Sequence, residues 1–570
     1  MTIDEIIKIQ KEERDKCLSA ILSSTGKKKI IVAGAGTGKT FTFKQVLKAN
    51  SDGENLAMTF IRMLVNDMDS TFGDLAEVKT FHAFCKKILH EQNGKVELIP
   101  FLTKIIEEDA KFLELWLNDF DQKFQMLDEQ SSEVSFYLKR GDYYDAVSFN
   151  DSVYRLYKVL QSKPEIVPNF NNILIDEFQD FNPLEVSFIN ELEKKGNILI
   201  VGDDDQAVYP LRCASPDYLR EKYNSGDYEK FELPYCSRCT EVIINATNSF
   251  LSVAQKKGFL KSRINKKYEC FIDTKSEESN RFPKIITAQL KIGKSFGKYI
   301  DYLIQRISDI DISESWSEGS EYPTVLVVGP RQYLKLVQNE LAEKYPQIIY
   351  KFSEEKPIAV IDGYNILLRN ENSNLGWRII INFYYSDNEI KSIIQESERG
   401  KDMIEILNKS FQQNQKRVLE IIQIIKKDED FNNDVKKELK TIVEDNYDEI
   451  VKYYSKEDEK EIALDKTKPS ILLTSFVGCK GLSAGYVVII GANDGDIPKD
   501  PNNIKDIEIC QFMVAMTRTR KECHIISNKW HIAPFLNGIY QTENRKSSFL
   551  DWIPKQFFED KGLLSSSDIN

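Results

Sequence analysis

Several features that would place this chain in a specialised class are missing from its 570 residues. No apolar run approaches the roughly 18 residues that a membrane-spanning helix needs. The longest runs, such as Val487–Ile490, have the length of buried strands. The N-terminus, Met1–Glu5, lacks the basic region and apolar stretch of a secretory signal. Nine cysteines are too sparse for a disulfide framework. These absences exclude a transmembrane protein and predict a cytoplasmic one without a membrane partner.

Metal ligands and excess positive charge are also scarce. Only Cys236 and Cys239 have the spacing of a zinc knuckle, and the chain has four histidines and no second CxxC pair. A chance pair is therefore favoured over a zinc site, which needs about four ligands. The 77 basic and 89 acidic residues give a net charge of −12. That balance argues against bulk coating of nucleic acid but leaves room for a local basic channel.

Short apolar runs, each followed by a turn and a helical pattern, predict two parallel α/β sheets. Two stretches with helical periodicity interrupt them. We expect four domains, in line with the length: a first α/β domain (1–85 and 166–232), its helical insertion (86–165), a second α/β domain (233–384 and 467–570) and its helical insertion (385–466).

A phosphate-binding loop follows the first predicted strand. Residues 33–40 read AGAGTGKT and lead into a helical pattern, which is the context that such a loop requires. Lys39 can neutralise phosphate oxygens, and the Thr40 hydroxyl suits Mg²⁺. We expect the nucleotide to contact Ala33, Gly34, Ala35, Gly36, Thr37, Gly38, Lys39 and Thr40.

Two acidic segments follow later predicted strands. DEFQD at 176–180 and GDDDQ at 202–206 should reach the same edge as the phosphate loop, because the carboxyl ends of parallel strands share one edge. Asp176 suits the Mg²⁺ shell, Glu177 can orient and deprotonate the attacking water, and Gln206 can sense the terminal phosphate.

In this order, the segments resemble the signatures of the superfamily-1 DNA helicases of the UvrD, Rep and PcrA type. Further segments resemble other motifs of that family, namely residues 80–84, 233–240, 480–482, 491–498, 517–518 and 547–554. The resemblance runs from about residue 30 to residue 554 and implies two RecA-like motor domains, with ATP and Mg²⁺ as cofactors. By the same resemblance, Arg238 reaches the γ-phosphate and Arg518 is an arginine finger from the second motor domain.

The resemblance implies an ATP-dependent translocase or helicase that moves 3′ to 5′ on single-stranded or partly duplex DNA, in repair or in anti-phage defence. The DNA contacts that it implies are Phe60, Thr80, His82, Tyr209 and Leu211. Leu211 stands where the family has a stacking tryptophan, which weakens strand grip because leucine has no π-face. Gln10 is the candidate for reading the adenine base.

Two other interpretations stay open. The first is a DNA- or nucleotide-gated ATPase switch that regulates a partner nuclease and unwinds little itself. The replaced tryptophan and the short insertions motivate it, and no segment after Arg520 resembles a nuclease, so cutting would need a partner. The second is a small-molecule kinase, which shares only the phosphate loop and explains neither residues 176–180 nor Arg518.

Overall fold

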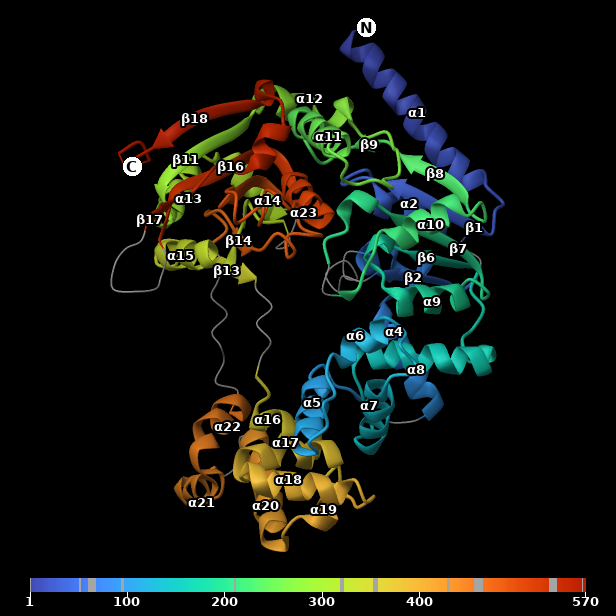
Figure 1. Ribbon diagram of the computed structural model, residues 1–570, viewed down its shortest axis with the longest axis vertical. Helices are drawn as coiled ribbons and strands as arrows, with labels where there is room; N and C mark the ends of the chain where they lie inside the picture. Colours follow the sequence, from blue (N-terminus) through green and yellow to red (C-terminus); the bar gives the residue numbers. More distant parts are fainter. Residues whose placement is uncertain are drawn as a thin grey trace.

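Two parallel β-sheets lie next to each other, and two groups of helices extend from one side of the pair (Figure 1). The computed structural model describes residues 2–50, 53–59, 68–93, 97–209, 212–317, 322–351, 357–427, 431–455, 465–532, 541–565 and 567–569. Among the helices in these ranges, none has both the length and the apolar character needed to cross a bilayer.

The first sheet has the strand order β3-β2-β6-β7-β1-β8, with every pair parallel. Its strands are β1 (Lys28–Ala33), β2 (Asn55–Thr59), β3 (Glu77–Thr80), β6 (Asn172–Ile175), β7 (Asn197–Gly202) and β8 (Glu229–Leu233). Because β1, β6 and β7 are neighbours, their carboxyl ends bring the phosphate loop and both acidic segments to one edge.

Both faces of this sheet are covered. On one face, Ile31 packs in a buried cluster with residues of α1 (Ile3–Ser23) and α2 (Lys39–Ala49). On the other face, Ile30 belongs to a cluster that includes α9 (Pro183–Leu192). A strand buried on both faces reads as a continuous apolar run, which is why the strands could be found in the sequence.

The second sheet has the order β13-β14-β12-β15-β16-β11-β18, all parallel, and β17 pairs antiparallel with the end of β16. Its strands are β11 (Ile285–Ile292), β12 (Val325–Val328), β13 (Ile348–Lys351), β14 (Ile471–Thr474), β15 (Ala484–Ile490), β16 (Thr519–Ile532), β17 (Gln541–Glu543) and β18 (Phe558–Leu564). Helices α11 (Glu241–Lys256) and α23 (Asp506–Met516) share a buried cluster with one face, and α13 (Phe296–Ile304) and α15 (Arg331–Leu341) with the other. A two-stranded pair, β9 (Tyr235–Cys236) and β10 (Glu269–Cys270), and helices α10 (Asp217–Asn224), α12 (Ile272–Arg281) and α14 (Asp309–Ser317) complete this part of the chain. The fold is therefore α/β with two parallel sheets, as the sequence predicted.

A first group of helices follows β3. It consists of α4 (Phe81–Asn93), α5 (Leu102–Phe112), α6 (Phe120–Gln125), α7 (Ser132–Tyr143) and α8 (Phe149–Ser162), with the short strands β4 (Glu97–Leu98) and β5 (Ala146–Val147). The apolar stripes of α5 and α8 are buried, for example at Ile105 and Leu156. This group occupies the region expected for the first insertion.

The second group comprises α16 (Val360–Leu367), α17 (Asn374–Tyr384), α18 (Asp387–Ser397), α19 (Met403–Ile406), α20 (Lys409–Lys427), α21 (Asn433–Val443) and α22 (Tyr447–Tyr454). Helices α16 and α17 pack on each other, and α16 packs on α22. The helical body therefore begins at Val360, earlier than the expected start at residue 385. The run Ile379–Ile381 in α17 is buried throughout, and periodicity cannot distinguish such a run from a strand.

A buried ion network joins the two groups of helices. The Asp109 carboxylate on α5 lies 2.6 Å from Arg140 Nη2 on α7 and 2.7 Å from Arg378 Nε on α17, and all three side chains are at most 1% exposed. Arg140 also pairs at 3.0 Å with Glu398, just after α18. Every charge of this network is paired, and the pairs connect α5 and α7 of the first group with α17 of the second. The two groups form one helical body, as Figure 1 shows for α5, α17 and α18.

Candidate active site

The phosphate loop has the backbone geometry that its glycines predict. Gly36 and Gly38 have φ of +71° and +91°, a left-handed region that favours glycine. A Cβ on Gly36 would lie 2.4 Å from the Cβ of Arg238, so the close approach of these two segments also requires glycine. Helix α2 begins at Lys39, within the last two residues of the loop, so the loop leads into a helix N-terminus with free N–H groups. The loop is built to bind an anion.

A pocket of about 440 Å³ lies between this loop and the second sheet. Residues 35–40 of the phosphate loop line it from the first sheet with Asp176, Glu177 and Gln206, whereas Ala33 and Gly34 do not. The other lining residues are Ser237, Arg238, Lys275, Glu278, Glu314, Gly481, Arg518, Arg520 and Lys521. Six of the lining side chains are basic and four are acidic, which suits a polyphosphate. The structure thus brings together the residues predicted from separate segments, from Lys39 to Arg518.

Glu177 and Asp176 differ in their electrostatic environments. Lys39 Nζ lies 2.8 Å from Glu177 Oε1, and Lys480 Nζ lies 3.6 Å from Oε2. Burial alone would raise the pKa of Glu177, but these two ammonium groups outweigh it and hold the pKa well below its ordinary value. Burial raises the pKa of Asp176 to about 6, because Lys39 compensates it only in part. A buried carboxylate that lacks full compensation fits a cation.

The Lys39 ammonium is held by the same pair of carboxylates. Burial would lower its pKa, but the charges of Glu177 and Asp176 outweigh burial and raise it. Glu177 has a φ of 54°, in the left-handed region. Non-glycine residues in this region cost on the order of 1–3 kcal/mol and cluster at functional sites. The left-handed backbone at Glu177 places its carboxylate against Lys39 at the wall of the pocket.

Gln206 connects the first sheet with the facing arginine. Its Nε2 donates to Asp203 Oδ2 at 2.7 Å, and its Oε1 accepts from Arg518 Nη2 at 3.2 Å. Burial and the nearby Arg238 charge lower the pKa of Arg518. Nη1 of Arg238 is buried without a hydrogen-bond partner in the part of the chain that the structure describes. Arg518 is buried and Arg238 is partly buried, so an anion between the two guanidinium groups would relieve their repulsion.

Thr40 and Asp176 line the same pocket and offer the oxygen ligands that Mg²⁺ prefers. Burial raises the pKa of Asp176, and a divalent cation bound to this carboxylate would stabilise its charged form. The residues present therefore fit a magnesium ion bound together with phosphate.

Gln10 has a structural role in place of the predicted nucleotide contact. It is buried on α1, where Nε2 donates to the Cys270 carbonyl at 3.0 Å and Oε1 accepts from the Ile272 N–H at 3.0 Å. Both ends of the amide are thus engaged with backbone. A separate pocket of about 470 Å³ beside the phosphate loop is lined by Arg14, whose guanidinium lies 4.8 Å from the Phe271 ring centroid, and not by Gln10. This pair offers flat surfaces for a base.

The predicted DNA contacts are only partly covered by the described residues. Phe60 and Leu211 lie outside them. The Thr80 hydroxyl accepts from the Ala83 N–H at 3.1 Å and so caps α4. His82 packs edge-on against Phe149, and burial, with a smaller effect of Arg212, lowers its pKa to about 3, so the ring is neutral at physiological pH. The Tyr209 ring lies 5.5 Å from the Lys480 ammonium, at the boundary between the two sheets.

Glu185 on α9 gives a prediction about stability and pH. Burial raises its pKa from 4.5 to about 7, although Arg212, 3.2 Å away, acts in the opposite direction. A raised folded-state pKa stabilises the fold below the ordinary pKa, and this contribution is lost as pH rises through about 7. We expect Glu185→Gln to gain stability relative to the wild type between about pH 5 and pH 8, by up to about 3 kcal/mol for the full shift.

Urea denaturation at the two pH values measures this difference. Glu191→Gln is the control, because Glu191 lies on the same helix and pairs with the exposed Lys194. A stability difference between Glu185→Gln and the wild type that stays constant with pH would contradict the assignment of a buried, proton-binding carboxyl group.

Sequence reasoning missed several residues of the site. Lys480 lies in a recognised motif, but its reach to Glu177 and Asp180 in the first sheet could not be read from it. Lys275 on α12 and Lys521 on β16 carry no local signal at all. The Tyr268 hydroxyl donates to the Ala35 carbonyl at 2.9 Å and supports the loop from outside. These residues come to the site through packing.

The two parallel sheets, the glycine-rich loop, the acidic segments and the facing arginines define a phosphate-loop nucleotide hydrolase with a two-domain motor fold. Residues 14–138 and 133–227 match the UvrD/REP helicase N-terminal domain, and residues 320–530 match the UvrD-like helicase C-terminal domain. The chain belongs to the UvrD/REP helicase family, and its two sheets are the cores of two RecA-like motor domains.

Known relatives agree with this assignment. The chain is 23% identical to a probable DNA helicase II homolog of Mycoplasma capricolum, over 98% of this chain and 89% of the relative. It is 22% identical to the probable homolog of Mycoplasma genitalium, over 94% and 86%. Its similarity to DNA helicase II of Escherichia coli, at 24% identity, covers 39% of this chain and 38% of that protein. The chain is a divergent member of the family.

Proposed function

We propose that this helicase moves 3′ to 5′ along single-stranded DNA and couples each step to ATP hydrolysis between its two motor domains. The observation that carries the proposal is the single pocket that collects Lys39 and Glu177 from the first sheet and Arg518 from the segment between α23 and β16. An arginine from a facing domain acts only when the domains are closed, so closure and hydrolysis are coupled.

In this proposal, the Lys39–Glu177 ion pair separates when ATP enters. Lys39 turns to the phosphate oxygens, and Glu177 becomes free to take a proton from the attacking water. Gln206 orients that water, while Arg238 and Arg518 stabilise the charge on the transferred phosphoryl group. Mg²⁺, held by Thr40 and Asp176, would neutralise phosphate charge. These roles are supported by the shared lining of one pocket.

The DNA strand, single or partly duplex, is proposed to cross both domains near Tyr209 and His82. Phe60, Thr80 and Leu211 are proposed as further DNA contacts. The protein would act in the cytoplasm, in DNA repair or anti-phage defence. A partner nuclease or another repair or defence protein would supply any cutting. The position of Tyr209 and Lys480 supports this proposal. Both lie at the boundary of the two sheets, where closure of the domains would move them relative to each other.

A strand-displacement assay tests the proposal. We expect single-stranded DNA to stimulate ATP hydrolysis at least about tenfold, and the protein to displace a strand from a duplex with a 3′ overhang but not from one with a 5′ overhang. Stimulation should weaken at higher salt, because counterions compete for the phosphate contacts. ATP hydrolysis without displacement from either substrate would contradict a translocating helicase and favour a nucleotide-gated switch that acts on a partner nuclease.

A further inference from the structure

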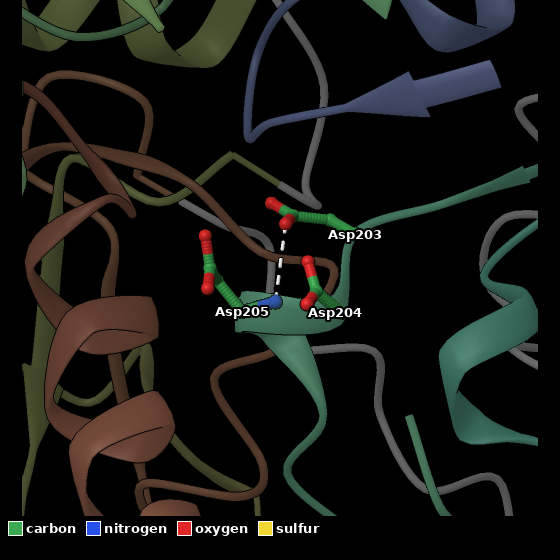
Figure 2. A group of neighbouring side chains, drawn as sticks. All are labelled: Asp203, Asp204 and Asp205. Atoms are coloured by element: carbon green, nitrogen blue, oxygen red, sulfur yellow. Dashed lines mark hydrogen bonds between the residues drawn. The ribbon is translucent and has the colours of Figure 1, made fainter. Parts of the chain in front are cut away.

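Three consecutive buried carboxylates, Asp203, Asp204 and Asp205, lie on the turn after β7, directly before Gln206 (Figure 2). Each is at most 3% exposed. In the described part of the chain, they are the one group of acidic, histidine or cysteine side chains close enough together to hold a metal ion. Three neighbouring buried negative charges repel one another strongly unless a cation lies among them.

That cation is the ammonium group of Lys266. Its Nζ lies 2.6 Å from Asp203, 2.9 Å from Asp204 and 2.6 Å from Asp205, and its side chain is 4% exposed. Burial alone would lower the pKa of Lys266, but the three carboxylates outweigh burial and raise it. The lysine therefore stands where a metal ion would otherwise bind, and the acidic group is no metal site while Lys266 is present.

The three carboxylates do not depend equally on Lys266. Asp204 also pairs with Arg220 at 3.0 Å, and Asp205 pairs with Arg263 at 2.7 Å. Asp203 has no other ion pair among the described residues. Removing the lysine charge would therefore affect Asp203 most.

Asp203 connects Lys266 with the pocket. One of its oxygens accepts from Lys266, and the other accepts from Gln206 Nε2 at 2.7 Å. An ionised carboxylate only accepts hydrogen bonds, so it selects the NH₂ end of the Gln206 amide and leaves the oxygen end for Arg518, 3.2 Å away. Asp203 Oδ1 also accepts from the Asp205 N–H at 3.1 Å (Figure 2), so this backbone bond remains without the ammonium. The unscreened repulsion among the three carboxylates would then act on the Asp203 oxygen that holds the Gln206 amide.

Lys266 comes from the segment between α11 and β10, far along the chain from Gln206. Ile264 in this segment donates its N–H to Asp204 at 2.8 Å, so the backbone as well as the side chain is anchored at the turn. The orientation of a glutamine in the first sheet is thus set by a segment that follows it in the chain.

We infer that Lys266 is a positioning residue that orients the Gln206 side chain for hydrolysis by fixing Asp203. This inference rests on the proposed function of Gln206 at the terminal phosphate. Lys266 does not line the pocket, and its link to Gln206 runs through Asp203, which holds both side chains.

Lys266→Met tests the inference, because methionine keeps an unbranched side chain and removes the charge. In the full-length protein with single-stranded DNA, we expect kcat for ATP to fall about 10- to 100-fold while KM changes less than about threefold, because only a transition-state group is misplaced. Lys261→Met, at an exposed position five residues earlier, is the control and should keep kcat within about twofold of the wild type.

A double-mutant cycle separates positioning from general structural support. Gln206→Ala should lower kcat at least as much as Lys266→Met, and the double variant should be no slower than Gln206→Ala alone, because Lys266 then has nothing to position. Wild-type kcat in Lys266→Met, or losses that multiply in the double variant, would overturn the inference. Wild-type kcat in Gln206→Ala would instead overturn the proposed function of Gln206.

Asp203→Asn keeps the test decisive if Lys266→Met does not fold. This variant leaves Lys266 paired with Asp204 and Asp205 and removes one buried charge, so the turn remains neutralised. An asparagine can present either end of its amide to Gln206, so the selection of the NH₂ end is lost. We expect the same fall in kcat and the same lack of additivity with Gln206→Ala. An unchanged kcat in Asp203→Asn would overturn the inference as well.

Discussion

Replacing Glu177 with Gln is expected to leave ATP bound but almost unhydrolysed, with kcat lower by about 10²- to 10⁴-fold. The amide keeps the size of the carboxylate but cannot accept the proton of the attacking water. Binding should not weaken, because Glu177 pairs with Lys39 at 2.8 Å and this ion pair competes with phosphate for the ammonium group. Removing this competing ion pair leaves Lys39 free for the phosphates, so the Kd for ATP should be unchanged or lower.

Two measurements on the same preparation check this expectation. Steady-state hydrolysis gives kcat, and equilibrium binding of a nucleotide gives Kd. Lys39→Ala is the contrasting variant, because it removes the charge that binds phosphate and should abolish hydrolysis and weaken binding together. Turnover at the wild-type rate in Glu177→Gln would show that another group takes the proton.

Arg518→Ala is expected to lower kcat by about 10³-fold or more, the range of an arginine finger, with little change in KM. The side chain is buried, contacts Gln206 and shares the pocket with Arg238. Burial, and after it the charge of Arg238, lowers the pKa of Arg518. A phosphoryl group that gains negative charge in the transition state relieves this repulsion more than bound ATP does. The variant therefore loses stabilisation mainly in the transition state.

Arg306→Ala serves as the control, because Arg306 is an exposed arginine of the same motor domain that does not line the pocket. Rates measured at saturating and at low ATP separate the two parameters. An effect of Arg518→Ala on KM alone would assign this arginine to ground-state binding and not to the chemical step.

The sheets and their functional edge could be predicted from the sequence because the relevant signals are local. A run such as Ile173–Ile175 is buried on both faces, so its apolar character is continuous, and the acidic residues that follow must emerge at the carboxyl edge. The phosphate loop is equally local, since its glycines, Lys39 and Thr40 occupy consecutive positions. The roles of Asp176 and Glu177 as separate groups remain predictions, although their pKa values are shifted in opposite directions.

The remaining features depend on contacts between distant segments. Gln10 lies 260 residues before its partner Cys270, and nothing near Gln10 in the sequence indicates that its amide will bind backbone there. Lys266 is one basic residue among many until the fold places it beside Asp203. The start of the second helical group at Val360 was missed because α16 has only eight residues and the buried run Ile379–Ile381 in α17 reads equally well as a strand.

The buried carboxylate of Asp109 also limits how the protein can be shortened. Its two arginine partners belong to different insertions. Deletion of residues 360–455 would therefore remove Arg378 from Asp109 and expose the apolar surface of the first insertion that the second now covers. Such surfaces promote aggregation. A minimal motor made from this chain must therefore lose both insertions together, or carry polar replacements across the face of α5 that α18 now covers.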